Sequence, residues 1–169
     1  MSENFALFLN YLFCDSPYRI KKIISQYNNL DTFSAHLDTY LANQNMGTKK
    51  SQEIKKRFAA FNLEEYKTKL TKLGLKYILA DSPKYPAQLR QISHHPIVLF
   101  YKGNIDLLSQ EIISIVGSRI HSRYGAEATR KLVQNLKPYF IIASGGAKGI
   151  DTIAHTTALE HDIPTISVW

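Results

Sequence analysis

The sequence predicts an α/β protein in which a helical segment, residues 1–75, precedes an incomplete domain of the parallel, doubly wound type, residues 76–169. Two apolar runs, 112–116 and 140–143, each end in a glycine-bearing loop that is followed by a helical pattern. Strand, loop and helix repeated in this order are typical of βαβα winding. Before Gly74, by contrast, apolar residues recur at helical spacing.

Residues 1–75 are predicted to form a series of short helices. The first is strongly apolar over 5–13 and ends before Ser16 and Pro17, which suit the N-cap and the first position of the next helix. Gly74 stops the last helix in the C′ position. The predicted helices after the first cover residues 17–27, 32–41, 49–61 and 63–73.

Residues 76–169 are predicted to alternate strands with helices. The strand-like runs are 75–80, 97–101, 112–116, 140–143 and 165–169. Helical patterns cover 124–137, which Pro138 is expected to end, and 151–160. Because the last strand coincides with the end of the sequence, we expect an incomplete sheet.

The composition is that of a globular protein without a secretion or membrane signal. Of 169 residues, 44% are hydrophobic, and no run approaches the roughly 18 apolar residues of a membrane helix. The single cysteine, Cys14, excludes an intrachain disulfide and fits a reducing cytoplasm, and it is expected to be buried in its apolar helix. A net charge of +7 is consistent with an acidic partner, of which nucleic acid is the commonest, and equally with a merely soluble basic protein.

We expect the two glycine-bearing loops to form one anion site. Ligands bind outside the carboxyl ends of parallel strands, and backbone N–H groups at helix starts combine with nearby cations to favour phosphate oxygens. The predicted site residues are Gly117, Ser118 and Arg119 in the first loop, and Ser144, Gly145, Gly146, Lys148 and Gly149 in the second. Their spacing matches neither GxGxxG nor GxxxxGK[ST], which disfavours ordinary dinucleotide binding and P-loop hydrolysis. The alternative is a pair of tight turns whose cations are merely solvated.

Other chemistry-bearing residues have simpler interpretations. Asp151 suits the N-cap of the following helix, and His155 lies one turn later on the same face. A structural Asp–His contact is favoured over a catalytic dyad. His94 and His95 lack metal-ligand spacing. The lysine-rich stretch 49–57 either faces solvent or meets nucleic acid, and solvation is favoured.

Several segments together resemble the DprA/Smf family, the DNA-processing protein A of bacterial natural transformation. They are, in order, 85–89, 96–103, 115–119, 124–125, 144–151, 154–155, 158–159 and 165–168. The resemblance spans residues 76–169 and implies an incomplete Rossmann-like domain there. Residues 1–75 resemble the SAM-like or helix-hairpin-helix-like N-terminal domain of the family only in position and texture.

The resemblance implies a cytoplasmic protein that binds single-stranded DNA, protects incoming strands and helps to load the recombinase RecA. It also implies a homodimer that acts without cofactor, metal or catalysis. The phosphate-gripping arginine of the family corresponds to Arg119 and its loop lysine to Lys148, while the loop glycines shape the pocket. Gly146 departs from the family, which usually has leucine there, and the later strands, Arg-bearing motif and dimer surface of the family lie beyond residue 169. The alternative is an enzyme, since the pocket also resembles nucleoside-monophosphate phosphoribohydrolases of the LOG or lysine-decarboxylase-like group.

Overall fold

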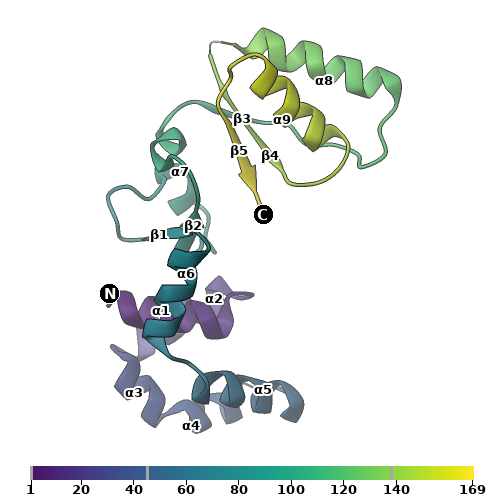
Figure 1. Cartoon of the computed structure of the whole chain (residues 1–169). Coiled ribbons are helices and arrows are strands. Elements are labelled where there is room, and N and C mark those ends of the chain that lie inside the picture. The colour runs from purple at the N-terminus through teal and green to yellow at the C-terminus, as the bar shows by residue number, and fades with distance from the viewer. Residues whose placement is uncertain (1, 45, 138) are drawn as a thin grey trace. The chain divides into compact units, whose positions relative to one another are not determined.

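The computed structural model describes residues 2–44, 46–137 and 139–169, which form two compact units (Figure 1). We call Met1–Gly103 the helical unit and Asn104–Trp169 the sheet unit. The sequence suggested a division after residue 75, whereas the compact units divide after Gly103. No helix in the described ranges is long and apolar enough to cross a membrane.

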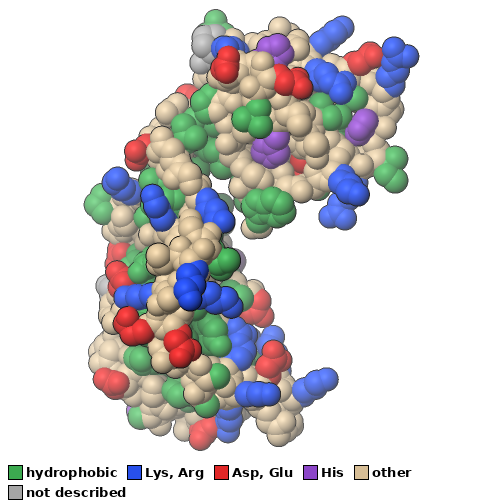
Figure 2. Space-filling model, viewed as in Figure 1, with side chains coloured by type: hydrophobic (Ala, Val, Ile, Leu, Met, Phe, Trp, Pro, Cys, Tyr) green, Lys and Arg blue, Asp and Glu red, His purple; other side chains and the backbone are tan. Residues whose placement is uncertain are grey.

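The two units differ in charge. The helical unit has fifteen lysines and arginines against eight aspartates and glutamates, whereas the sheet unit has six of each. Lysine and arginine side chains are spread over the visible face of the helical unit rather than gathered in one patch (Figure 2). The whole net positive charge therefore belongs to the helical unit.

Helix α1 (Glu3–Phe13) forms the centre of the helical unit, because nearly all of its side chains from Phe5 onward are buried. Phe8 packs edge-on against two aromatic rings, with centroid distances of 5.0 Å to Phe61 and 5.4 Å to Phe58. A helix that is apolar on all sides must be surrounded by other elements. Those elements are α2 (Pro17–Gln26), α3 (Leu30–Ala35), α4 (Leu37–Asn43), α5 (Thr48–Ala59) and α6 (Leu63–Lys72).

The predicted start of α2 is confirmed, since the Ser16 side chain accepts a hydrogen bond from the Arg19 N–H at 3.4 Å. The single helix predicted over 32–41 is wrong. It is divided at His36, whose φ of −112° and ψ of 7° leave the helical region without a glycine or proline to signal it. The expected burial of Cys14 is also wrong, because this residue follows the last turn of α1 and is exposed.

Three of the five cations of α5 form contacts within the helical unit. Lys50 pairs with Asp15 at 3.6 Å, and Lys55 pairs with Asp38 at 2.6 Å. Arg57 donates a hydrogen bond to the Tyr11 carbonyl, and its guanidinium carbon lies 5.2 Å from the centroid of the Tyr11 ring. These contacts favour a structural interpretation of the lysine-rich helix over a nucleic-acid surface.

Strands β1 (Lys76–Leu79) and β2 (Val98–Tyr101) form an antiparallel pair, with Lys76 opposite Tyr101. The short helix α7 (Ala87–Arg90) lies in their connection. The sequence predicted both strands within residues 76–169 but not their partners, and the structure pairs them with each other and not with the parallel sheet. The side chains of Val98, Tyr77 and Phe100 pack on the core of the helical unit instead.

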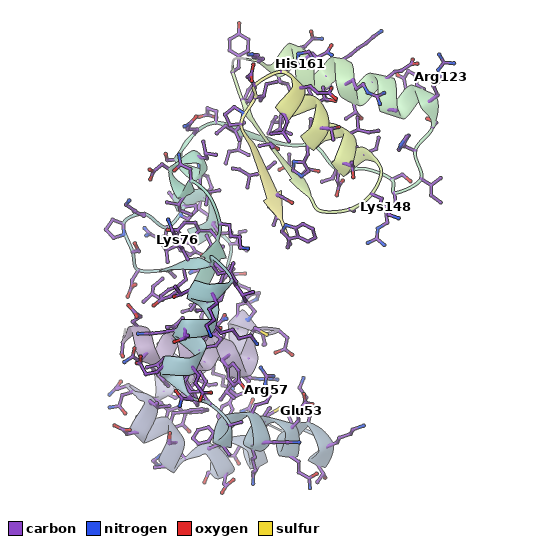
Figure 3. All side chains as sticks on the ribbon, in the orientation of Figure 1. Glu53, Arg57, Lys76, Arg123, Lys148 and His161 are labelled. Atoms are coloured by element: carbon purple, nitrogen blue, oxygen red, sulfur yellow. The ribbon has the colours of Figure 1, made fainter. Side chains whose placement is uncertain are left out.

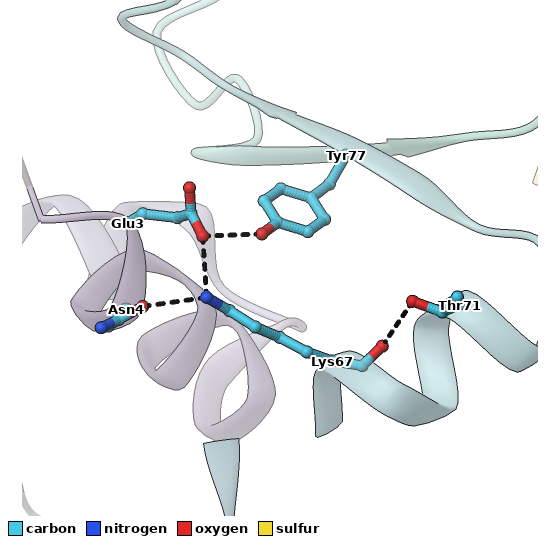
Figure 4. Close-up of polar contacts among 5 residues, drawn as sticks. All are labelled: Glu3, Asn4, Lys67, Thr71 and Tyr77. Atoms are coloured by element: carbon cyan, nitrogen blue, oxygen red, sulfur yellow. Dashed lines mark hydrogen bonds and ion pairs between the residues drawn. The ribbon is translucent and has the colours of Figure 1, made fainter. Parts of the chain in front are cut away.

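Glu3 links three elements of the helical unit (Figure 4). Its Oε1 accepts hydrogen bonds from Lys67 Nζ of α6 at 3.0 Å and from the Tyr77 hydroxyl of β1 at 2.8 Å. Lys67 Nζ also donates to Asn4 Oδ1 at 3.2 Å, and the Thr71 hydroxyl donates to the Lys67 carbonyl at 3.0 Å. The bonds from Lys67 and Tyr77 lower the pKa of Glu3. Burial, followed by the bond to Glu3, raises the pKa of Tyr77 to about 12.

The sheet unit contains a parallel sheet with the strand order β3-β4-β5, as the sequence predicted, and the α/β class is confirmed. Helices α8 and α9 pack on each other and share one core with the sheet. Because the order does not reverse, right-handed crossovers place both helices on the same face. Pro138, which the sequence predicted to end the helix over 124–137, lies outside the described residues. The elements are η1 (Ile105–Ser109), β3 (Ile112–Ser114), α8 (Arg123–Leu136), β4 (Ile141–Gly145), α9 (Ile150–Glu160) and β5 (Thr165–Val168).

Candidate functional site

The two glycine-bearing loops leave the same edge of the parallel sheet. β3 ends at Ser114, which is paired with Ala143, and β4 ends two residues further on at Gly145. The Ile115 N–H extends the pairing by donating to the Ala143 carbonyl at 2.9 Å. Both loops therefore lie at the carboxyl edge, where open α/β sheets bind their ligands.

Gly149 is the point at which the two loops touch. A Cβ on this residue would lie 2.2 Å from the Ser118 carbonyl oxygen and 2.7 Å from that of Arg119. Its φ of +94° is also a conformation that residues with side chains rarely adopt. The next residue, Ile150, donates its N–H to the Ser118 carbonyl at 3.2 Å. Only glycine fits here, and the fit brings the predicted residues of the two loops together.

Gly117 and Ser144 also stabilise the contact between the two loops. A Cβ on Gly117 would lie 2.7 to 2.9 Å from three side-chain carbons of Ile150. The buried Ser144 hydroxyl donates to the Ile115 carbonyl at 2.6 Å. In the first loop, the Ser118 hydroxyl donates to the Ile120 carbonyl at 2.6 Å. Since both serine protons are already donated, these residues shape the loops and offer no free O–H to a ligand.

Arg119 and Lys148 are exposed cations on the adjoining loops. Lys148 directly precedes Gly149, and Gly149 packs against the backbone carbonyl of Arg119. Figure 3 shows the Lys148 side chain projecting from the loop between β4 and α9. Neither cation forms an ion pair with a carboxylate in the part of the chain that the structure describes. The predicted convergence of the two loops at one edge is thus observed, and both charges remain available to an anion.

The start of α9 differs from the prediction. Gly149, not Asp151, is the N-cap, because the backbone at Gly149 turns so that Ile150 can bond to Ser118. Asp151 lies in the first turn of the helix, where a carboxylate is favoured by the helix dipole. Its Oδ2 occupies space next to Gly145, 2.7 Å from where a Cβ of that glycine would be. Gly145 therefore has a packing reason to be glycine.

His155 holds the second loop through contacts that the sequence did not suggest. Its Nε2 lies 2.9 Å from the Gly145 carbonyl and its Nδ1 lies 2.7 Å from the Thr165 hydroxyl. A carbonyl only accepts, so Nε2 carries a proton in this arrangement. The favoured contact with Asp151 is replaced by these two bonds, which tie α9 to the ends of β4 and β5.

Trp169 is a candidate site residue that the sequence reasoning missed. Its side chain is 96% exposed, yet it lies against Gly146, where a Cβ would come within 2.5 to 2.6 Å of three ring carbons. The signal was present in the strand pattern. Val168 of β5 pairs with Gly145 of β4, so the residue that follows β5 emerges at the same carboxyl edge. Because Gly146 has no side chain, it leaves room for this indole.

Across residues 2–44, 46–137 and 139–169, no group of three or more His, Cys, Asp or Glu side chains could hold a metal ion. What the loops offer is two cations, close backbone approach and one aromatic face. These groups suit a ligand with both an anionic and a planar part.

Comparison with known proteins places the chain in a family. The family model described as DNA recombination-mediator protein A matches residues 76–169, more than half of the chain. The chain belongs to this family, DprA/Smf. The matched residues include both loops.

Relatives support this membership at two levels. The DNA processing protein DprA of Streptococcus pneumoniae is 48% identical over 84 residues, covering 50% of this chain and 30% of the relative. That of Bacillus subtilis is 29% identical over 164 residues, covering 92% of this chain and 55% of the relative. A crystal structure of DprA from Streptococcus pneumoniae matches with a TM-score of 0.67 at 28% identity, covering 97% of this chain and 54% of that one. The chain thus spans about half, or less, of the length of these relatives.

Proposed function

We propose that this DprA/Smf chain binds single-stranded DNA at the two loops and acts in DNA processing without catalysing a reaction. The observation that carries the proposal is the contact at Gly149, which joins a loop with Arg119 to a loop with Lys148. An arginine can bind a phosphate through two parallel N–H bonds, and a lysine adds a point charge. A sugar-phosphate backbone presents such groups in succession.

Trp169 gives the same site a place for a base. Base–aromatic stacking contributes strongly to single-strand binding and tolerates any sequence, because every base has a π face. A duplex keeps its bases stacked inside, so an exposed indole beside a phosphate site favours a single strand. The names of the relatives, a DNA recombination mediator and DNA processing proteins, agree with this ligand.

We also propose a wider role, which rests on the resemblance to the family and not on the geometry of the loops. The protein protects incoming strands during natural transformation, assists RecA loading and works as a homodimer in the cytoplasm. The chain spans about half, or less, of the length of its relatives, so the part of this role that we assign to the loops is DNA binding.

The test is fluorescence anisotropy of a labelled thymidine oligonucleotide at several salt concentrations. Replacing Arg119 and Lys148 together by glutamine should weaken binding at least about ten-fold, because hydrogen bonds to charged groups each contribute about 1.5–3 kcal/mol. The slope of log K against log salt should fall by about 1.4, or 0.7 for each single-strand phosphate contact. The matched control is Arg130→Gln with Lys131→Gln, which removes two exposed charges from α8 of the same unit. Equal affinities of the two double variants would refute the site.

A second readout addresses the enzyme alternative. The chain is incubated with nucleoside monophosphates, and free base is measured by chromatography. Release of base that disappears in the loop double variant would replace the binding proposal with the phosphoribohydrolase one. We expect no release, because the loops present cations and a stacking surface but no carboxylate paired with His155.

A further inference from the structure

A second hollow with phosphate-binding and stacking groups lies in the helical unit. It is lined by Tyr18, Lys21, Lys22 and Ser25 of α2, and by Ser93 and His94 of the turn that leads to β2. The four α2 residues are spaced i, i+3, i+4 and i+7, so they share one face of the helix. The hollow is open and shallow, unlike the enclosed pockets that bury most of a small ligand.

The turn at Ser93 is fixed to α2 by specific contacts. Lys21 Nζ donates to the Ser93 carbonyl at 2.7 Å and lies 3.2 Å from His95 Nδ1. The His94 ring meets Tyr18 edge-on, with a centroid distance of 5.5 Å and an interplanar angle of 85°. Tyr18 remains 61% exposed. The aromatic surface and Lys21 are therefore held in place before any ligand arrives.

The charge around this hollow is uncompensated. None of its lining residues is acidic, and Lys22 forms no ion pair with the carboxylates of the described ranges. On α5, by contrast, Lys50 and Lys55 are paired with aspartates. Since the whole net charge of the protein lies in the helical unit, a polyanion is attracted to this unit more than to the sheet unit.

We propose that the hollow is a second binding site for single-stranded nucleic acid, with a phosphodiester at Lys21 and Lys22 and a base stacked on Tyr18. An acidic peptide would use the cations but would gain nothing from the exposed ring. A single nucleotide would find too little enclosure, whereas a strand can make such open contacts repeatedly along its length. The proposal stands independently of the loops in the sheet unit.

The experiment uses the full chain with Arg119→Gln and Lys148→Gln already introduced, so that the loop site is removed. Binding of a labelled thymidine oligonucleotide is measured by anisotropy. Tyr18→Leu should weaken the remaining binding about five-fold or more, and Tyr18→Phe should restore it, because stacking needs the ring and not the hydroxyl. Lys22→Gln should lower the salt slope by about 0.7. The matched control is Lys49→Gln, which removes an exposed charge from α5 of the same unit.

Two further ligands separate stacking from plain charge attraction. An abasic oligonucleotide should bind the loop variant with and without Tyr18→Leu equally, since it has no base to stack on the ring. Poly-glutamate should bind weakly and respond only to Lys22→Gln. The proposal is overturned if Tyr18→Leu leaves the affinity for the thymidine strand unchanged, or if it lowers the affinity for the abasic strand as much. It is also overturned if Lys22→Gln changes the salt slope no more than Lys49→Gln does, or if the loop variant binds no strand at all.

Discussion

Replacing Gly149 by alanine tests whether the two loops touch as the structure shows. The new Cβ would lie 2.2 Å from the Ser118 carbonyl oxygen and 2.7 Å from the Arg119 carbonyl oxygen. Both neighbours are backbone atoms, which cannot swing aside as the end of a side chain can. The loops must therefore separate, and the bond from the Ile150 N–H to the Ser118 carbonyl is strained or lost.

The expected cost has two parts. Holding an alanine at positive φ costs about 1–2 kcal/mol. Forcing extra volume into a packed contact typically costs a further 1–3 kcal/mol. The free energy of unfolding should thus fall by about 2–5 kcal/mol, and the DNA affinity of the loop site should fall with it, because Arg119 and Lys148 would no longer adjoin.

Gly103→Ala is the matched control. Gly103 has a φ of +86° but nothing within 4 Å of its missing Cβ, so its substitution introduces the backbone strain alone. Urea unfolding followed by far-ultraviolet circular dichroism gives the loss of unfolding free energy for each of the two variants. The difference between the two losses measures the contribution of the loop contact. If Gly149→Ala is no more destabilising than Gly103→Ala, the loops do not meet at Gly149 and the argument for a joint site fails.

Two other predictions follow from contacts in the two units. Gly146→Leu should displace the indole of Trp169 and abolish the quenching of its fluorescence by single-stranded DNA, while the melting temperature changes by no more than about 2 °C, because the indole is exposed. Since Trp169 is the only tryptophan, intrinsic fluorescence reports on it directly, and unchanged quenching would contradict its role. The second concerns Glu3 and Tyr77. The lowered pKa of Glu3 means that its stabilisation is present above the usual glutamate pKa and is lost as the pH falls through the lowered value. The pKa of Tyr77, raised to about 12, means that stabilisation is lost as the pH rises from about 10 through that value. Glu3→Gln should remove the loss of stability at acid pH, measured by thermal melts. It should also lower the pKa of Tyr77, measured by phenolate absorbance relative to Tyr77→Phe. A Tyr77 titration unchanged by Glu3→Gln would refute the link between Glu3 and Tyr77.

The elements that the sequence predicted well are those with a local physical signal. Ser16 and Pro17 mark the start of α2 because a capping oxygen and a fixed φ act within one turn. Gly74, with a φ of +65°, ends α6 for an equally local reason. The division of the 32–41 helix at His36 has no such signal, since tertiary packing decides it. The partnership of β1 with β2 was missed because four-residue apolar strands show their type but not their partner.

The site shows the same limit. The convergence of the loops followed from one rule, that parallel strands present their carboxyl ends at a common edge. The contact of Gly149 with two carbonyls, and the bonds of His155 to β4 and β5, depend on where α9 lies against the sheet. Trp169 could have been found by applying the same rule to β5, whose last residue pairs with Gly145.

The division of charge between the units bears on how a strand would be bound. The sheet unit has no net charge, so its loops attract an anion only through local groups, Arg119 and Lys148, over about a Debye length of 8–10 Å. The helical unit has all of the excess charge but engages much of it in internal pairs such as Lys55–Asp38. Total charge therefore cannot identify the DNA-binding residues of this protein. Cations without a carboxylate partner beside an exposed aromatic ring can, and they occur at the loops and at the α2 hollow. Substitutions at the two places must therefore be made separately and then together.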